Sequence, residues 1–216
     1  MLRIGIVAHP RRKAMAEKLF ADVDADVIRY DNSKRRIGCE ANHRRVWADL
    51  VQIAKPGDWL VVLEDDAVPV PCFRTSVTAA LKHAPSPVVS LYLGQGRPSQ
   101  WLPRMKQAVA RADREDASWI VGDATIHGVG IAILGPDLVE EMLHKTVLYK
   151  GPIDQRMSMW LRQFQMRVAY TFPSLVDHAD VETVIEQHPD GRPREKGRVA
   201  WRFGNRTKWS NRRVPL

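Results

Sequence analysis

The chain has 216 residues, of which 44% are hydrophobic and 27% are charged, and both fractions are ordinary for a folded globular protein. This composition excludes a disordered chain, collagen and a long coiled coil. The length suits one compact domain with an appendage, large enough to bury a core without metal or disulfide staples. No apolar run approaches the ~18 residues of a membrane-spanning helix, and we expect no signal peptide at the N-terminus.

The two cysteines, Cys39 and Cys72, lack the CxxC spacing of a metal framework. We expect both to be reduced thiols in a cytoplasmic protein, with a disulfide between them as the alternative.

The formal net charge of +8 is concentrated at the C-terminal end. Residues 191–216 hold nine Lys and Arg residues and one Glu, so the rest of the chain is neutral. Trp201, Phe203 and Trp209 lie among these basic residues. Such a tail is either disordered or folded back onto the body, and it favours an anionic partner: nucleic acid, a phosphorylated ligand or a membrane surface.

The hydrophobic pattern predicts strands and helices along the chain. Strands are expected at Leu2–Ala8, Asp26–Tyr30, Trp59–Leu63, Val88–Leu93, Ile120–Val121, Ile126–Leu134 and Arg167–Phe172. Helices are expected at Arg11–Ala21, Cys39–Ala54, Phe73–His83, Leu102–Arg111, Pro136–Lys145 and Ile153–Phe164. Helices between strands are typical of an α/β sheet with crossover connections. We therefore expect one α/β domain over residues 1–190, with a central, mostly parallel sheet flanked by helices, followed by the basic tail over 191–216.

Three carboxylates directly follow a strongly apolar strand, since Leu60–Leu63 runs into Glu64, Asp65 and Asp66. In open α/β sheets, ligands bind beyond the carboxyl ends of the strands. Adjacent carboxylates repel one another, and a hard divalent cation such as Mg²⁺ or Mn²⁺ relieves that repulsion. Such an ion can neutralise a leaving diphosphate. The alternative is a solvated loop with an aspartate that caps the next helix.

The segment 36–67, RIGCEANHRRVWADLVQIAKPGDWLVVLEDDA, resembles the lipopolysaccharide-type galactosyltransferases of glycosyltransferase family 25. Their pattern is Gly-Cys, a Ser-His a few residues on, a helix carrying Trp, and a strand ending in Leu-Glu-Asp-Asp. The matching positions are Gly38, Cys39, His43, Trp47 and Leu63–Asp66. Asn42 stands where the family usually has Ser.

Shorter matches follow in the family's order over residues 1–185. His9–Ala16 resembles the first strand-to-helix segment, with Arg11 or Arg12 as its arginine. Gly128–Leu134 resembles a strand of small residues ahead of an amphipathic helix, Pro152–Asp154 resembles Pro-Val-Asp, and Pro173–Val176 resembles a late Pro-x-Leu-Val.

The resemblance implies a GT-A-like fold, a nucleotide-sugar donor with UDP as the nucleotide, a bound Mn²⁺ or Mg²⁺, and inversion at the anomeric carbon. It implies that Asp66 is a direct metal ligand and that Glu64 or Asp65 reaches the metal, the ribose or the sugar. His178, which follows Pro173–Val176, is a candidate to complete the metal shell, with an ordinary surface histidine as the alternative.

The resemblance also gives candidates for binding the donor. His9 and Arg12 lie in its first segment, and His43 lies on the helix before the acidic strand; a structural histidine is the alternative for His43. The basic triplet 34–36 is either a solvated loop or a contact to the diphosphate.

An inverting transfer needs a general base near the acceptor hydroxyl. Asp154 matches the family's aspartate and is the candidate, with a helix N-cap as the alternative. Asp123 and His127 are reserve candidates.

The sequence thus predicts a metal-dependent glycosyltransferase, a small stand-alone enzyme of a bacterial or viral cytoplasm. The basic, aromatic tail fits an acceptor that is a modified base in DNA, and the alternative is a tail that clamps the donor, with a glycan or protein as acceptor. Two other classes remain: a nucleic-acid-binding protein and a catalytically inactive sugar-binding protein on the same scaffold.

Overall fold

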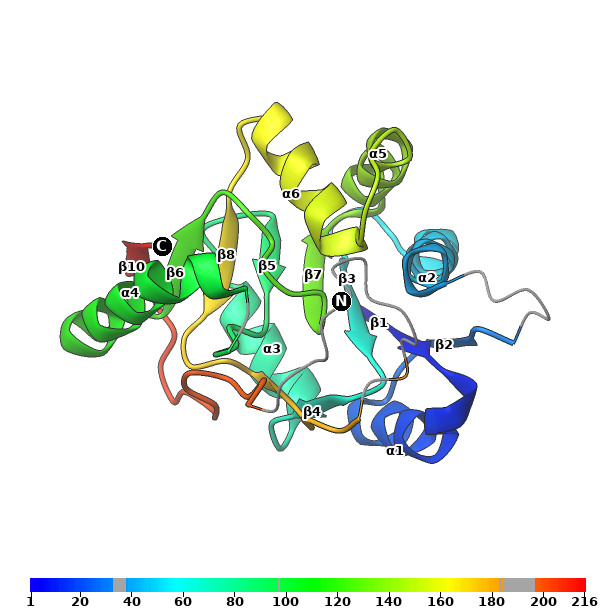
Figure 1. Cartoon of the computed structure of the whole chain (residues 1–216), viewed down its shortest axis with the longest axis horizontal. Coiled ribbons are helices and arrows are strands. Elements are labelled where there is room, and N and C mark those ends of the chain that lie inside the picture. Colours follow the sequence, from blue (N-terminus) through cyan, green and yellow to red (C-terminus); the bar gives the residue numbers. More distant parts are fainter. Residues whose placement is uncertain (33–37, 97, 183, 185–196) are drawn as a thin grey trace.

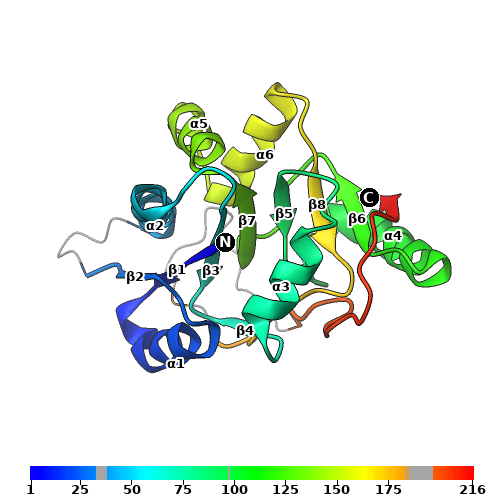
Figure 2. The ribbon, with the colours of Figure 1, turned by 180° about the vertical axis from the view of Figure 1, so that it is seen from behind.

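The computed structural model describes residues 1–32, 38–96, 98–182, 184 and 197–216. An eight-stranded sheet runs through the molecule in the order β10-β6-β8-β5-β7-β3-β1-β2, with helices packed on both sides (Figures 1 and 2). The expected α/β class, with a central, mostly parallel sheet flanked by helices, is confirmed.

The central strands of the large sheet form from apolar runs that are buried on both faces, whereas the edge strands β2 and β10 are partly exposed. They are β1 (Leu2–Ala8), β2 (Val27–Tyr30), β3 (Trp59–Glu64), β5 (Val88–Ser90), β6 (Trp119–Gly122), β7 (Gly130–Leu134), β8 (Val168–Thr171) and β10 (Arg213–Pro215). Strand β1 is parallel to β2 and β3, and β5 is parallel to β8. Strand β7 is antiparallel to both of its neighbours, β3 and β5. The loop that leads into β7 therefore reaches the edge of the sheet where β3 ends.

The helices lie in two layers, one on each face of the sheet (Figure 1). They are α1 (Lys13–Val23), α2 (Cys39–Ile53), α3 (Phe73–Leu81), α4 (Leu102–Glu115), α5 (Pro136–Thr146) and α6 (Ile153–Gln163), with short 3-10 helices η1 (Pro10–Arg12) and η2 (Ser99–Trp101). Buried residues of α1 and α3 pack in one core with Ile4, Ile6 and Leu63 of the sheet. Buried residues of α2, α4, α5 and α6 pack in a second core with Leu60 and Val62.

Alternation along β3 decides which core each of its side chains joins, because successive side chains of a strand point to opposite faces. Val61 and Leu63 lie in the α1 and α3 core, whereas Leu60 and Val62 lie in the α2 core. Glu64 continues this alternation toward α2. The next side chain, that of Asp65, belongs to the other face.

Two strands end or begin differently from the sequence expectation, because side chains replace the ladder hydrogen bonds. The strand expected from Ile126 begins only at Gly130, since the amides of Thr125 and Ile126 donate to Ser158 Oγ (2.9 Å) and Tyr170 Oη (3.0 Å). Strand β5 ends at Ser90, and the Leu93 amide donates to Ser174 Oγ at 3.0 Å.

Two helices also differ from the expected bounds. The segment expected as a helix from Arg11 starts as η1, whose first amide is capped by the His9 side chain, and α1 follows from Lys13. Helix α4 runs four residues beyond the expected end at Arg111 and stops where Asp116 takes a left-handed conformation with φ of 47°.

The described part of the basic tail, 197–216, folds back onto the body, which is the second of the two arrangements the sequence left open. Ala200 bridges to Gly94 and Phe203 to Ser174, and β10 adds a parallel strand next to β6. Trp209 is 6% exposed, and its ring lies 5.3 Å from that of Trp119.

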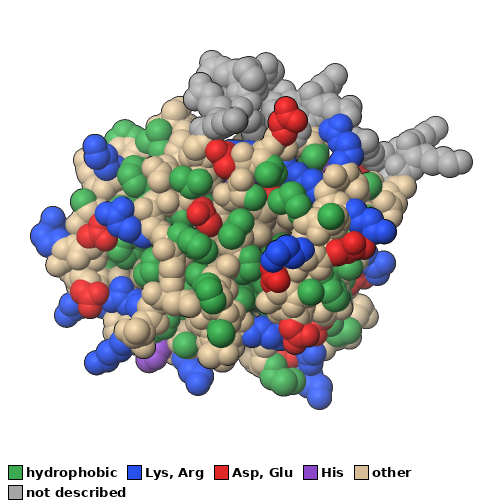
Figure 3. Space-filling view, turned by 90° about the horizontal axis from the view of Figure 1, so that it is seen from below, with side chains coloured by type: hydrophobic (Ala, Val, Ile, Leu, Met, Phe, Trp, Pro, Cys, Tyr) green, Lys and Arg blue, Asp and Glu red, His purple; other side chains and the backbone are tan. Residues whose placement is uncertain are grey.

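The arginines of the folded tail bond to the body. Arg198 donates to Val181 O (2.8 Å), Arg202 to Asp113 (2.8 Å), Arg206 to Ala117 O (3.1 Å) and Arg212 to Glu115 O (2.7 Å). These bonds hold the tail against the body, and one of them, from Arg202 to Asp113, is an ion pair. On the face shown in Figure 3, acidic and basic side chains are interspersed.

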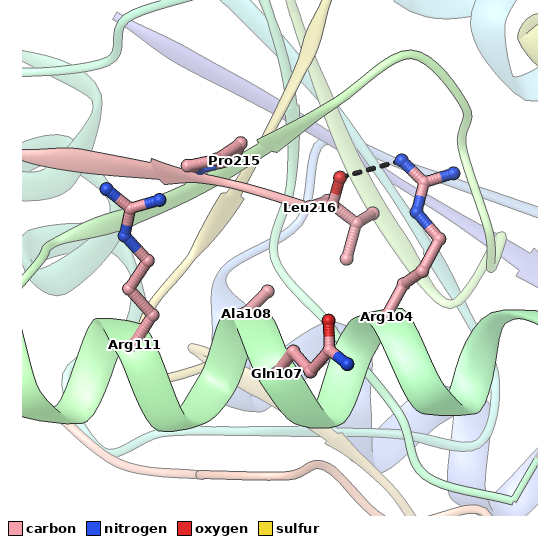
Figure 4. Close-up of a pocket in the computed structure, with 6 residues that line it drawn as sticks. All are labelled: Arg104, Gln107, Ala108, Arg111, Pro215 and Leu216. Atoms are coloured by element: carbon pink, nitrogen blue, oxygen red, sulfur yellow. Dashed lines mark hydrogen bonds between the residues drawn. The ribbon is translucent and has the colours of Figure 1, made fainter.

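The chain end docks on α4, as Figure 4 shows. Arg104 Nη2 donates to Leu216 O at 2.8 Å. A hollow of about 240 Å³ lies there, lined by Arg104, Gln107, Ala108, Arg111, Pro215 and Leu216. It is at the opposite edge of the sheet from β2.

Candidate active site

The three carboxylates lie where β3 ends, at the edge of the sheet that β1 also reaches. Glu64 is the last residue of β3, and Asp65 and Asp66 precede the short strand β4 (Ala67–Pro69). Asp65 and Asp66 are 5% and 4% exposed. The alternative of a solvated loop that caps the next helix is therefore wrong, since both aspartates are buried and α3 begins only at Phe73.

Arg12 bridges the two buried aspartates. Its Nη1 atom lies 2.9 Å from Asp65 Oδ1 and 2.5 Å from Asp66 Oδ2, and its Nη2 donates to Glu182 O at 2.6 Å. Burial alone would lower the pKa of Arg12, but Asp66 and Asp65 raise it above its ordinary value. Arg12 thus neutralises part of the negative charge that adjacent carboxylates create.

His9 fixes Asp65 through its main chain. The His9 amide donates to Asp65 Oδ2 at 2.7 Å, while its Nδ1 accepts from the Arg11 amide at 3.2 Å. Burial raises the pKa of Asp65 to about 6, against the opposing effect of the bonds from His9 and Arg12. Both oxygens of Asp65 therefore have donors within the protein.

Asp66 is the carboxylate with an unused oxygen. His178 Nε2 lies 3.3 Å from its Oδ2, which Arg12 also contacts. Its Oδ1 is buried and has no hydrogen-bond partner among the described residues. Burial by itself would raise the pKa of Asp66, but His178 and Arg12 outweigh burial and lower it, so the carboxylate is ionised.

His178 reaches Asp66 through the small second sheet. It is the last residue of β9 (Val176–His178), which is antiparallel to β4 and sets His178 opposite Ala67. The Ala179 amide donates to Asp66 O at 2.9 Å, and the Asp180 amide donates to His178 Nδ1 at 2.8 Å. This second bond leaves Nε2 of His178 as the nitrogen that faces the aspartate.

Glu64 contacts different residues from those that Asp66 contacts, because Glu64 ends β3 and Asp66 lies beyond it, in the turn that leads to β4. Its Oε1 lies 3.2 Å from Nε2 of His43, a buried histidine on α2. A ligand atom of Cys39 lies within 4.8 Å of both. Burial alone would lower the pKa of His43, but Cys39 and Glu64 raise it to about 10.

Asp154, the second residue of α6, belongs to the Glu64 side of the site. Burial raises its pKa to about 6, Glu64 contributes to the rise, and His43 opposes it. The cap residue of α6 is Pro152, so Asp154 is not the N-cap, although its Oδ1 accepts from the Gln155 amide at 2.8 Å.

Gly128 brings Glu64 and the start of α6 close together. A Cβ atom built on Gly128 would lie 3.0 Å from Glu64 Oε1 and 3.7 Å from Ile153 Cγ2. The Glu64 amide also donates to Val129 O at 3.0 Å. A side chain at this position would press on the Glu64 carboxylate, which would have to shift slightly.

Asn42, which departs from the family's Ser, has a structural task here. Its Nδ2 donates to Ala8 O at 3.2 Å and to Arg29 O at 2.9 Å. It thereby holds α2 against the carboxyl ends of β1 and β2.

The fold thus gathers the sequence-predicted residues into two adjoining groups. We name the first the Asp66 group, which contains Arg12, Asp65, Asp66, His178 and the main chain of His9. We name the second the Glu64 group, which contains Cys39, His43, Glu64 and Asp154. Asp123 lies outside them, 45% exposed and 3.8 Å from Arg162. The basic triplet 34–36 lies outside the described residues.

Sequence reasoning missed Tyr92, whose ring lies 5.0 Å from that of His127 and 6.4 Å from that of His178. Its hydroxyl donates to Arg198 O, and burial raises its pKa. Its position two residues after β5, at the same edge of the sheet as the three carboxylates, could have identified Tyr92 as a candidate. Tyr92 ties the folded tail to the site.

No protein-family model matches this sequence, and a search of curated proteins found no match. Both cysteines are free thiols. Within the described ranges, no helix combines the length and the apolar character needed to cross a membrane.

Proposed function

We propose that the protein is a metal-dependent glycosyltransferase that moves a sugar from a nucleoside diphosphate donor, with UDP as the nucleotide, to an acceptor hydroxyl with inversion. The observation that carries the proposal is the buried, unpartnered Oδ1 of Asp66, with His178 Nε2 at 3.3 Å from the other oxygen. A buried acceptor atom without a donor requires an explanation, and a bound cation supplies one.

Asp66 and His178 are the residues that would hold Mn²⁺ or Mg²⁺, with His178 binding through Nε2 once its proton moves to Nδ1 and the bond from the Asp180 amide is released. Carboxylate oxygen suits both ions and imidazole suits Mn²⁺ better, so the pair favours Mn²⁺. When bound, the ion stabilises the negative charge of the leaving diphosphate. Asp65 is less suited to direct ligation because both of its oxygens are engaged, and Glu64 is turned toward His43.

Arg12 is the residue we assign to the donor diphosphate. Its guanidinium is nearly buried and already faces the carboxylates that would hold the ion. Arginine binds phosphate oxygens through paired N–H groups. Asp65, held by His9 and Arg12, is placed to accept from a hydroxyl of the ribose or the sugar.

Asp154 is the general base in this proposal. Its carboxylate takes the proton of the acceptor hydroxyl as the hydroxyl oxygen attacks the anomeric carbon, and the bond from that carbon to the diphosphate oxygen breaks. A base whose pKa is raised to about 6 is stronger than an ordinary carboxylate and is still ionised at pH 7. Glu64 and His43 position this side of the site.

The acceptor we favour is a hydroxyl of a glycan or protein rather than a base in DNA. Arg198 and Arg206 of the folded tail are bonded to the body, and Trp209 is buried, so these side chains are not free to bind phosphates or stack on bases. The free thiols fit the proposed cytoplasmic location.

Donor hydrolysis tests the proposal. The full chain is incubated with a panel of nucleotide sugars, with Mn²⁺, with Mg²⁺ and with EDTA, and free nucleotide is measured. We expect hydrolysis that requires the metal and is lost in Asp66→Asn, while Asp49→Asn, a surface aspartate paired with Arg29, keeps it. A catalytically inactive sugar-binding protein would bind a donor without turnover, and full activity in EDTA would refute the metal assignment.

A further inference from the structure

Cys39, His43 and Glu64 form a second cluster of metal-ligating side chains. Their ligand atoms all lie within 4.8 Å of one another, and His43 Nε2 is 3.2 Å from Glu64 Oε1. None of the three contacts the Asp66 group through a hydrogen bond or ion pair described for the structure. The inference below therefore does not rest on the proposed glycosyl transfer.

Helix α2 and strand β3 bring these three side chains together. Cys39 and His43 are four residues apart on α2, so their side chains lie on one face of the helix. Glu64 ends β3 on the face that packs against α2 through Leu60 and Val62. The burial of His43 and the close fit at Gly128 restrict two of the three side chains.

The donor atoms are one sulfur, one nitrogen and one oxygen. Thiolate and imidazole are ligands of Zn²⁺, whereas Mg²⁺ and Ca²⁺ prefer oxygen alone. Bonds of about 2.0–2.3 Å to Zn²⁺ put the ligand atoms of a tetrahedral site roughly 3.3–3.8 Å apart. The observed separations reach this range with small side-chain rotations.

The local charge also favours a cation. Glu64 carries a carboxylate and is close enough to Asp154 to act on it electrostatically. Metal binding displaces the protons of a thiol and an imidazole, so the Cys39 thiolate formed in that way and the Glu64 carboxylate would balance the two charges of a divalent ion.

We propose that Cys39, His43 and Glu64 bind one Zn²⁺ ion with three protein ligands. Because Cys39 is exposed, the fourth position is open to water or to a small ligand. The site is separate from the pair Asp66 and His178, and it ties the start of α2 to the end of β3.

Cobalt substitution and zinc titration test this site. The full chain is stripped of metal with EDTA, desalted and titrated with Co²⁺, and the thiolate-to-cobalt charge-transfer absorption is recorded. Zinc affinity is then measured by competition with a chromophoric chelator. We expect the charge-transfer band to saturate at one thiolate-bound Co²⁺ per chain, and we expect loss of that band in Cys39→Ser with zinc affinity at least tenfold weaker.

Matched variants make the result specific. Cys72→Ser removes the other exposed cysteine and should keep both the band and the affinity. Asp66→Asn should also keep them, which separates this site from the proposed catalytic metal. Zinc should protect Cys39, but not Cys72, from alkylation by iodoacetamide, as read by peptide mass spectrometry.

Circular dichroism of each variant checks folding, and the exposed position of Cys39 makes Cys39→Ser the primary variant, with His43→Gln as the second. Binding of zinc with equal affinity by wild type and Cys39→Ser, absence of the charge-transfer band, or alkylation of Cys39 at the same rate with and without zinc would each overturn the proposal.

Discussion

His178 faces Asp66 because β9 pairs with β4, the strand that begins immediately after Asp66. The register sets His178 opposite Ala67, so the histidine and the aspartate meet at one end of a two-stranded ribbon. This pairing joins a late segment of the chain to the acidic end of β3. It also leaves one buried oxygen of Asp66 without a partner.

The first prediction concerns this pair. His178→Gln should weaken activation by Mn²⁺ by at least tenfold while donor turnover at saturating Mn²⁺ recovers in part, since one of two assigned ligands remains. The measurement is the Mn²⁺ dependence of donor hydrolysis. His83→Gln, on an exposed histidine after α3, is the control and should behave as wild type. An unchanged Mn²⁺ dependence in His178→Gln would remove His178 from the metal site.

The second prediction concerns Arg12. Arg12→Met should destabilise the fold by roughly 3 kcal/mol at neutral pH, because removing one partner of a buried ion pair leaves uncompensated charge. Urea unfolding measures this, and Lys13→Met, an exposed neighbour, should cost less than about 0.5 kcal/mol.

The same variant carries a pH dependence whose sign follows from the carboxylates. The pKa of Asp66 is lowered in the folded protein, so its contribution to stability is present above the unfolded pKa and is lost as pH falls through the folded pKa. Without Arg12, Asp65, whose pKa is already raised to about 6, takes up a proton more readily. The loss of unfolding free energy in Arg12→Met, relative to wild type, should therefore be largest near pH 8 and become smaller below about pH 6. A deficit independent of pH would contradict this reading.

The third prediction concerns the base. Asp154→Asn should lower transfer by about 10²–10⁴-fold, the range for loss of general-base catalysis, with donor affinity almost unchanged. Because a base must be ionised, wild-type kcat/KM should fall as pH drops below about 6, the raised pKa of Asp154. Asp123→Asn, on the exposed reserve candidate, should keep transfer. Near-normal transfer by Asp154→Asn would return that residue to a purely structural role.

The fourth prediction concerns the aromatic residues of the tail. Trp209→Ala should destabilise the fold by about 3–5 kcal/mol, the usual cost of truncating a buried aromatic side chain, because Trp209 packs on Trp119. Phe203→Ala, at 42% exposure, should cost less than about 1 kcal/mol. Thermal or urea unfolding separates the two, and equal effects would mean that the tail does not pack as described.

The fifth prediction concerns nucleic acid. Because Arg198 and Arg206 are bonded to the body and Trp209 is buried, we expect no steeply salt-sensitive affinity for duplex or single-stranded DNA at low ionic strength, where phosphate contacts are strongest. Fluorescence anisotropy of labelled DNA measures this with the full chain. Strong binding that weakens steeply with salt, and that is lost in a chain shortened to residue 190 and shown to be folded, would restore DNA as the acceptor.

The sequence by itself determined the α/β class and most of the elements. Apolar runs such as Leu2–Ala8 and Trp59–Leu63 are short and continuous, and the fold buries them as central strands. The helix predicted at Cys39–Ala54 is present as α2, because its apolar face packs on β1 and β3. The sequence also placed Glu64, Asp65 and Asp66 at the end of a buried strand. These features depend on local pattern alone.

Tertiary structure decided how those three carboxylates are used. Glu64 ends β3 on the face of α2 and meets His43, whereas Asp65 and Asp66 form the turn to β4 and meet Arg12 and His178. No spacing along the chain reveals these partners. They come from the β4–β9 pairing and from the packing of α1 and α2 on opposite faces of the sheet.

The tail shows the same division. Composition identified nine basic residues within 191–216 but could not tell a free charged arm from a folded segment, because a charge count contains no information on partners. Only the folded chain supplies the carbonyl oxygens of Val181, Ala117 and Glu115 that accept from the tail arginines. Hydrogen bonds of this kind join residues distant in sequence, and they hold the described segment 197–216 against the body.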